Sequence, residues 1–180
     1  IDFMKEAKLL EQELIAIRRD FHMHPELGFE ELRTSNRIRE ILKQEGIEST
    51  VIAKTGVCAL IKGEDEGRVI ALRADMDALP LQDKKQCDYS STYEGKMHAC
   101  GHDAHTAILL GAAKILNKHR NKLKGTVMLI FEPAEETVGG ARFMIEEGIL
   151  EEPYVDAVIG LHVSEEVPCG KISIRRGVVN

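Results

Sequence analysis

Four features are missing from this 180-residue sequence: a cluster of basic residues, a long apolar run, a Cys-x-x-Cys pair and a signal peptide. Lys and Arg residues are scattered among acidic ones and the net charge is −6, which argues against a nucleic-acid-binding surface. No apolar run reaches the roughly 18 residues of a membrane-spanning helix. The four cysteines form no Cys-x-x-Cys pair, and the amphipathic, acidic start does not resemble a signal peptide. We therefore expect a cytoplasmic protein whose partners include neither nucleic acid nor membrane.

The composition is that of an ordinary globular domain, with 43% hydrophobic and 30% charged residues. Apolar periodicity predicts an amphipathic helix over residues 2–20 and a second helix that ends at Gly46. His22 and His24 are interpreted as structural residues of the turn between these helices. Strands are predicted at 49–53, 56–63, 68–74, 125–133, 156–163 and 169–178, helices at 103–119 and 139–148, and a polar loop at 81–97. This alternation predicts an α/β fold with helices covering a mostly parallel or mixed sheet, in which the strands at 125–133 and 156–163 are buried.

The stretch MHACGHDAHT, residues 97–106, is unusually rich in side chains that bind metals. The whole chain has seven histidines and four cysteines, and four of these eleven residues lie in this window. The window precedes and enters a predicted helix. A helix N-terminus lowers the pKa of a nearby thiol, so we expect Cys100 to form a thiolate readily.

Polar side chains also follow three of the predicted strands. Asp75 and Asp77 follow the strand at 68–74, Glu135 and Glu136 follow the strand at 125–133, and His162 lies in the strand at 156–163. In open α/β sheets the functional crevice lies outside the carboxyl ends of the strands. If these strands are parallel, all of these groups meet along one edge.

A thiolate, imidazoles and carboxylates together suit a divalent transition metal and are a poor set for calcium or magnesium. Cys100 and His102, two residues apart, can face one metal site from a turn. Glu135 and Glu136 are adjacent, so their side chains diverge, and one can bind metal while the other faces the water that the metal activates. The pattern therefore indicates metal-assisted hydrolysis.

Five motifs, in this order, resemble those of the M20 amidohydrolases: RRDFHMHPELGFEE, ALRADMDALP, MHACGHDAHTA, FEPAEETVGGA and GLHV. The similarity is to the branch of N-acyl-amino-acid amidohydrolases, hippurate hydrolases and plant auxin-conjugate hydrolases. It implies a zinc-exopeptidase-like α/β three-layer sandwich. It also implies an aminoacylase that hydrolyses the amide bond of its small-molecule substrates, N-acyl amino acids.

The resemblance further implies two bound divalent transition-metal ions, Zn, Mn, Ni or Co, and makes Glu135 the general base. The implied metal ligands are Cys100, His102, Glu136 and His162. Asp77 and Asp103 are implied to orient these ligands, while His105 is left open between such a role and packing.

Some features depart from the family or extend beyond the chain. Glu132 stands where the family usually has Gln, and it either changes pKa values near the site or points away. Gly139 and Gly140 are expected to allow close backbone approach.

The family also carries a lid and dimerisation domain, then the rest of the catalytic domain with a last histidine ligand. Residues 1–180 are therefore expected to be the N-terminal part of the catalytic domain of a homo-oligomeric parent, which leaves the activity of this segment alone open.

Other interpretations remain beside the amidohydrolase. An M20-type metallo-carboxypeptidase or a deacetylase would use the same site. A thiol hydrolase would use Cys100 as nucleophile with His102 or His105 as base, and unlike a metalloenzyme it would survive a chelator. A non-catalytic metal-binding module or an inactive fragment would have no need for Glu135.

Overall fold

A computed structural model describes residues 1–174, 176 and 177. Its centre is a five-stranded sheet in the order β1-β2-β4-β3-β5. The strands are β1 (Ser49–Ile52), β2 (Gly56–Lys62), β3 (Asp65–Asp75), β4 (Lys124–Glu132) and β5 (Ala157–Gly160). The α-helices are α1 (Phe3–Met23), α2 (Leu32–Gln44), α3 (His102–Lys118), α4 (Glu135–Val138) and α5 (Gly140–Glu146), with a short 3-10 turn at Arg120–Lys122. Within the described part of the chain, no helix is both long and apolar enough to cross a membrane.

The sheet is mixed, as the α/β prediction allows. β3 runs parallel to both β4 and β5, whereas β1 with β2 and β2 with β4 are antiparallel. The parallel pairs arise because α3 connects β3 to β4, and α4 with α5 connects β4 to β5. The carboxyl ends of β3, β4 and β5 consequently lie at one edge of the sheet.

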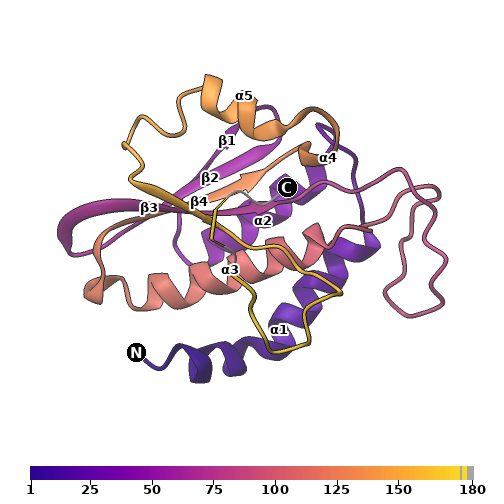
Figure 1. Cartoon of the computed structure of the whole chain (residues 1–180), viewed down its shortest axis with the longest axis horizontal. Helices are drawn as coiled ribbons and strands as arrows, with labels where there is room; N and C mark the ends of the chain where they lie inside the picture. The colour runs from indigo at the N-terminus through magenta and orange to yellow at the C-terminus, as the bar shows by residue number, and fades with distance from the viewer. Residues whose placement is uncertain (175, 178–180) are drawn as a thin grey trace.

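Helices cover the two faces of the sheet unequally. α1, α2 and α3 lie on one face, below the sheet in Figure 1, and α5 lies on the other. Side chains of a strand alternate between faces, and β4 follows this rule. Leu129 and Phe131 belong to the core beneath α1–α3, while Met128 and Ile130 pack with Met144 of α5. The three-layer arrangement predicted from the sequence is thus confirmed.

Two sequence predictions at the C-terminal end are corrected. The segment 156–163 was expected to form a buried strand, but all four residues of β5 are exposed, including Val158 at 52% and Ile159 at 57%. β5 is an edge strand that pairs with β3 on one side, so its apolar character does not bury it. The strand expected at 169–178 is not formed over 171–174, which are irregular, and 175 and 178–180 lie outside the described residues.

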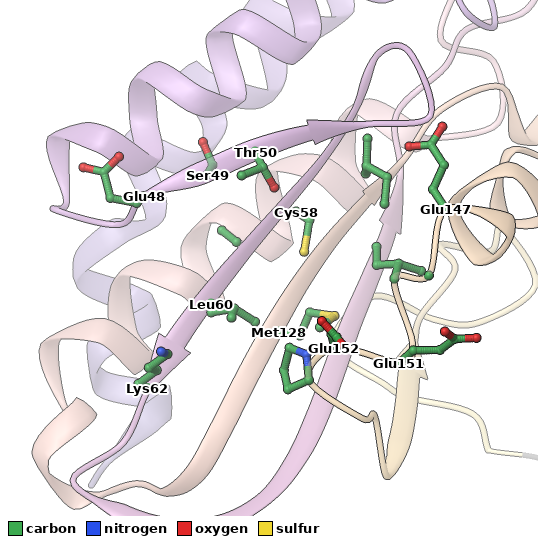
Figure 2. Close-up of a pocket in the computed structure, with 15 residues that line it drawn as sticks. Glu48, Ser49, Thr50, Cys58, Leu60, Lys62, Met128, Glu147, Glu151 and Glu152 are labelled. Carbon is green, nitrogen blue, oxygen red and sulfur yellow. The ribbon is translucent and has the colours of Figure 1, made fainter.

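A cavity of about 720 Å³ lies on the α5 face of the sheet (Figure 2). Cys58, Leu60 and Met128 contribute to its floor, and Glu147 and Glu152 lie at its rim. Burial raises the pKa of the Cys58 thiol to about 11. Because none of the predicted site residues lines this cavity, the candidate centre is a separate part of the molecule.

Candidate metal centre

The predicted site residues come together at the edge where the parallel strands end. β3 ends at Asp75 and β5 is followed by His162, while β4 leads through a tight turn into α4, which carries Glu135 and Glu136. Ala134, at the N-terminus of α4, has a φ of 51°, a left-handed conformation that turns the chain sharply after the strand. His102 is the first residue of α3. The convergence expected from the strand ends is therefore observed.

In the described part of the chain, three overlapping groups of ligand-type atoms share His102, and in each group the atoms lie within 4.8 Å of one another. One group adds Cys100 and His162, and the Sγ of Cys100 is 3.4 Å from Nε2 of His162. Another adds Glu135 and Glu136, whose carboxylate oxygens are 3.9 and 3.7 Å from Nε2 of His102. The three groups meet at His102, so the ligand-type atoms gather around one point at this edge of the sheet.

Two polar atoms in this cluster have no hydrogen-bond partner within the region that the structure describes, as expected of metal ligands. Among the described residues, Nε2 of His102 and Oε1 of Glu136 are buried and have no hydrogen-bond partner. A buried polar atom without a partner costs folding free energy, so two such atoms close together indicate a site for a ligand. A thiol, imidazoles and carboxylates are the donors that zinc and its neighbours prefer.

Asp77 contacts two of the predicted ligands. Its Oδ1 lies 3.0 Å from Nδ1 of His102, and its Oδ2 accepts the backbone N–H of Glu136 at 3.0 Å. With Nδ1 donating to this carboxylate, the Nε2 lone pair of His102 faces the cluster. One fully buried carboxylate therefore aims two of the predicted ligands.

Asp103, by contrast, faces α1. Its Oδ2 accepts a hydrogen bond from Nδ1 of His22 at 2.7 Å and forms an ion pair with Nε of Arg18, also at 2.7 Å. Burial opposes its charge, but the hydrogen bond from His22 and the nearby positive charges outweigh this and lower the pKa of Asp103. Asp103 thus anchors the first turn of α3, which carries His102, to α1.

His105, whose role was left open, connects the ends of β3 and β5. Its Nδ1 donates to Oδ1 of Asp75 at 2.5 Å, and its Nε2 accepts the backbone N–H of Val163 at 2.9 Å. Because Val163 follows His162 directly, His105 holds the segment that presents that ligand. Asp75 was expected at this edge of the sheet, as the first polar residue after the strand at 68–74, but no role was predicted for it.

Glu132, the departure from the family pattern, points away from the ligand atoms. Its Oε2 accepts from Nε of Arg73 at 2.6 Å, and its Oε1 accepts the backbone N–H of Ala141 at 2.8 Å. The close approach expected at the glycines is confirmed at Gly140, where a Cβ would lie 1.6 Å from the carbonyl oxygen of Pro133. Gly139 is required for a different reason, a φ of +67°.

The expectation that Cys100 readily forms a thiolate is wrong for the metal-free chain. Partial burial and the carboxylates of Glu136, Asp75 and Glu135 raise the pKa of its thiol to about 12. The helix N-terminus is outweighed by burial of the thiol and by these negative charges, which come from the end of β3 and from α4. A bound cation would reverse the balance, since a coordinating thiol is deprotonated outright.

The carboxylates also act on the neighbouring titratable groups. Burial opposes the charged form of His102, but hydrogen bonding to Asp77 and the charges of Asp75 and Glu136 raise its pKa. Burial and the negative charges of Asp75 and Glu136 raise the pKa of Glu135, although His102 acts in the opposite direction. An excess of negative charge is thus concentrated where the ligand atoms meet.

Comparison with known proteins places this geometry in a family. The pattern of Peptidase family M20/M25/M40 matches residues 71–177, the part of the chain that carries the cluster. The chain belongs to this family.

Curated relatives cover several amide-bond hydrolases. An N-acetylcysteine deacetylase from Bacillus subtilis is 48% identical over 94% of this chain and 45% of its own length. An IAA-amino acid hydrolase ILR1-like 2 from Arabidopsis thaliana is 49% identical over 98% of this chain and 40% of its own length. A thermostable carboxypeptidase 2 from Saccharolobus solfataricus is 43% identical over 97% of this chain and 45% of its own length. The chain therefore spans less than half the length of these relatives.

Among solved structures, a dinuclear metal binding peptidase of the M20 family from Bacillus subtilis superposes with a TM-score of 0.90. It is 48% identical, and the match covers 94% of this chain and 47% of that protein. The described fold is therefore that of the family.

Proposed function

We propose that this chain forms the metal-binding core of a hydrolase that cleaves the amide bond of N-acyl amino acids. The observation that carries the proposal is the meeting of two orphaned buried atoms, Nε2 of His102 and Oε1 of Glu136, beside Glu135. Relatives named as an N-acetylcysteine deacetylase and an IAA-amino acid hydrolase support the substrate class.

The proposed ligands of two divalent ions, Zn, Mn, Ni or Co, are Cys100, His102, Glu136 and His162. Bound there, two such ions would acidify a water molecule and polarise the carbonyl oxygen of the substrate. Asp77 and His105 would keep the ligands aimed, through His102 and through the backbone of Val163. The dinuclear metal binding relative supports the number of ions.

Glu135 is the proposed general base. Its Oε2 lies 3.9 Å from Nε2 of His102 and its side chain is 39% exposed, so it reaches both the cluster and solvent. Burial and neighbouring carboxylates raise its pKa, which improves its ability to accept a proton from water and hold it. Glu135 would then pass that proton to the amine that leaves as the amide bond breaks.

The same site would serve a carboxypeptidase, the activity named for the relative from Saccharolobus solfataricus, because that reaction also breaks an amide bond. The thiol-hydrolase alternative is disfavoured, since a thiol whose pKa is raised to about 12 is a poor nucleophile.

We also propose that the chain is the N-terminal part of a catalytic domain in a longer, homo-oligomeric enzyme with a lid and dimerisation domain and a last histidine ligand. The exposed apolar residues of β5 and the greater length of the relatives support this. Four cysteines that are all free fit a cytoplasmic location, and the acidic net charge disfavours nucleic acid as a partner.

The decisive experiment compares Glu135→Gln with Glu136→Gln in the enzyme that contains this chain. Glu135→Gln should retain bound metal and lose turnover of N-acetyl amino acids by about 10²- to 10⁴-fold, whereas Glu136→Gln should lose both. Metal content and the release of free amino acid are the readouts, and Glu152→Gln, at an exposed position, is the control. Full turnover by Glu135→Gln, or turnover that survives complete removal of metal by EDTA, would contradict the proposal.

A further inference from the structure

The loop 81–97 joins two halves of the candidate centre. It begins shortly after Asp77, and it ends three residues before Cys100. At its base, Leu79 and Met97 exchange two backbone hydrogen bonds of 3.0 Å. The position of Cys100 therefore depends on how this long segment, at the right of Figure 1, is held against the rest of the molecule.

His22 holds the loop through both nitrogens of its ring. Nδ1 lies 2.7 Å from Oδ2 of Asp103, and Nε2 lies 3.1 Å from Nζ of Lys85 in the loop. Since a lysine ammonium can only donate, Nε2 accepts in this contact, and Nδ1 is the ring nitrogen that donates to Asp103. The His22 ring is fully buried, so its hydrogen bond to Asp103 is shielded from water, while the contact with Lys85 lies nearer the surface.

The loop is shaped to receive this contact. Asp83, whose side chain is 1% exposed, accepts the backbone N–H groups of Lys85 and Ser91 at 2.9 Å each. The ring of Tyr89 packs edge-on against His22, with centroids 5.8 Å apart. These contacts fold the segment back onto the C-terminal end of α1.

The other end of the connection leads to the metal cluster. Asp103 follows His102 directly in the first turn of α3, and Arg18 supports it with an ion pair of 2.7 Å. A continuous chain of contacts thus runs from the loop through Lys85 and His22 to the residue beside His102.

We propose that His22 is a positioning residue that fixes Cys100 relative to His102 by tying the loop 81–97 to the start of α3. The inference rests on the proposed function, because it concerns two of the proposed ligands. It goes beyond a role in the turn between the first two helices, and it assigns to the histidine of the motif RRDFHMHPELGFEE a task at the metal centre. His22 itself touches neither ligand.

The test is a titration of the chain with Co²⁺, which reports thiolate ligation by a charge-transfer absorption in the near ultraviolet. His22→Asn can still donate to Asp103 but cannot reach Lys85. Lys85→Met removes the other partner at a less buried position and carries the test if the first variant does not fold. Both variants should weaken the affinity measured by this absorption by about tenfold, the lower end of the range for residues that support metal ligands.

Two controls separate positioning from general stability. His119→Asn alters a histidine at the C-terminal end of α3, whose Nε2 lies 3.5 Å from Oε1 of Glu6. Lys114→Met removes ion pairs at 2.9 and 2.5 Å to Glu13 and Glu45, on the far part of α3. Both should leave the Co²⁺–thiolate affinity unchanged, even where thermal stability falls.

The outcomes distinguish the inference from the proposed function. Hydrogen exchange should also accelerate in residues 81–97 of both His22→Asn and Lys85→Met. If the wild-type chain shows the absorption and both variants bind Co²⁺ through the thiolate within about twofold of wild type, the inference is overturned and the proposed function stands. If wild type itself shows no thiolate ligation, the proposed function fails and the inference fails with it.

Discussion

Glu31 gives the sharpest stability prediction, because a single buried carboxylate satisfies two segments beside the candidate centre. Its Oε1 accepts the backbone N–H of Ala134 at 2.8 Å, and its Oε2 accepts the hydroxyl of Thr55 at 2.6 Å. Glu31 is completely buried, and Ala134 holds the left-handed φ that directs Glu135 into the cluster. Removing the carboxylate leaves both donors without a partner.

The magnitude follows from the two donors. An unsatisfied buried donor costs about 1–3 kcal/mol. Burial raises the pKa of Glu31, which shows that burying this carboxyl is itself unfavourable, and its removal offsets part of the loss. Glu31→Ala should therefore lower the free energy of unfolding by about 2–4 kcal/mol. For a chain of this size, that loss lowers Tm by about 5–15 °C. Glu31→Gln should lose only about 1 kcal/mol, since its oxygen can accept from Ala134 while its amide donates to Thr55.

Urea and thermal unfolding followed by circular dichroism measure these differences. The matched control is Glu30→Ala, because Glu30 has a 62% exposed side chain and makes only a surface ion pair of 3.1 Å with Lys96. That variant should stay within about 0.5 kcal/mol of wild type. Equal losses for Glu31→Ala and Glu30→Ala would refute the hydrogen-bond argument.

Two further predictions concern titration. Burial opposes the charge of Asp83, but backbone hydrogen bonds, including that from Ser91, lower its pKa, so it contributes stability that is present above pH about 4 and lost as pH falls through the lowered pKa. Asp83→Asn should therefore be less stable than wild type in urea at neutral pH and lose that difference in acid; a constant difference would contradict this assignment. In the metal-free chain at pH 8, iodoacetamide should label exposed Cys87, whose pKa is lowered by its hydrogen bond to Ser90, at least about tenfold faster than Cys100, by mass spectrometry. Faster labelling of Cys100 would disprove the raised pKa of its thiol.

Local patterns in the sequence predict much of this architecture. Apolar periodicity and the polar residues after each strand predict the α/β fold and the meeting of Glu135, Glu136 and His162, because strand direction follows from the helical crossovers. Burial of β5 is not predictable in this way, since an apolar strand has the same pattern at a sheet edge as at its centre. The pKa of Cys100 likewise depends on carboxylates that are distant in sequence.

Contacts across the fold explain the remaining differences at the site. Asp103 lies next to His102 in sequence, yet successive helical residues point in different directions, so it faces α1 and His22. Glu31 has no distinguishing mark in a segment rich in glutamates, and only its burial against Thr55 reveals its role.

The most direct test of the account is anomalous scattering from crystals of the chain soaked in Mn²⁺ or Zn²⁺. The account predicts peaks bounded by Cys100, His102, Glu136 and His162, with Glu135 beside them and not coordinated. Metal bound elsewhere, or no peak among these four side chains at saturating metal, would contradict the proposed centre.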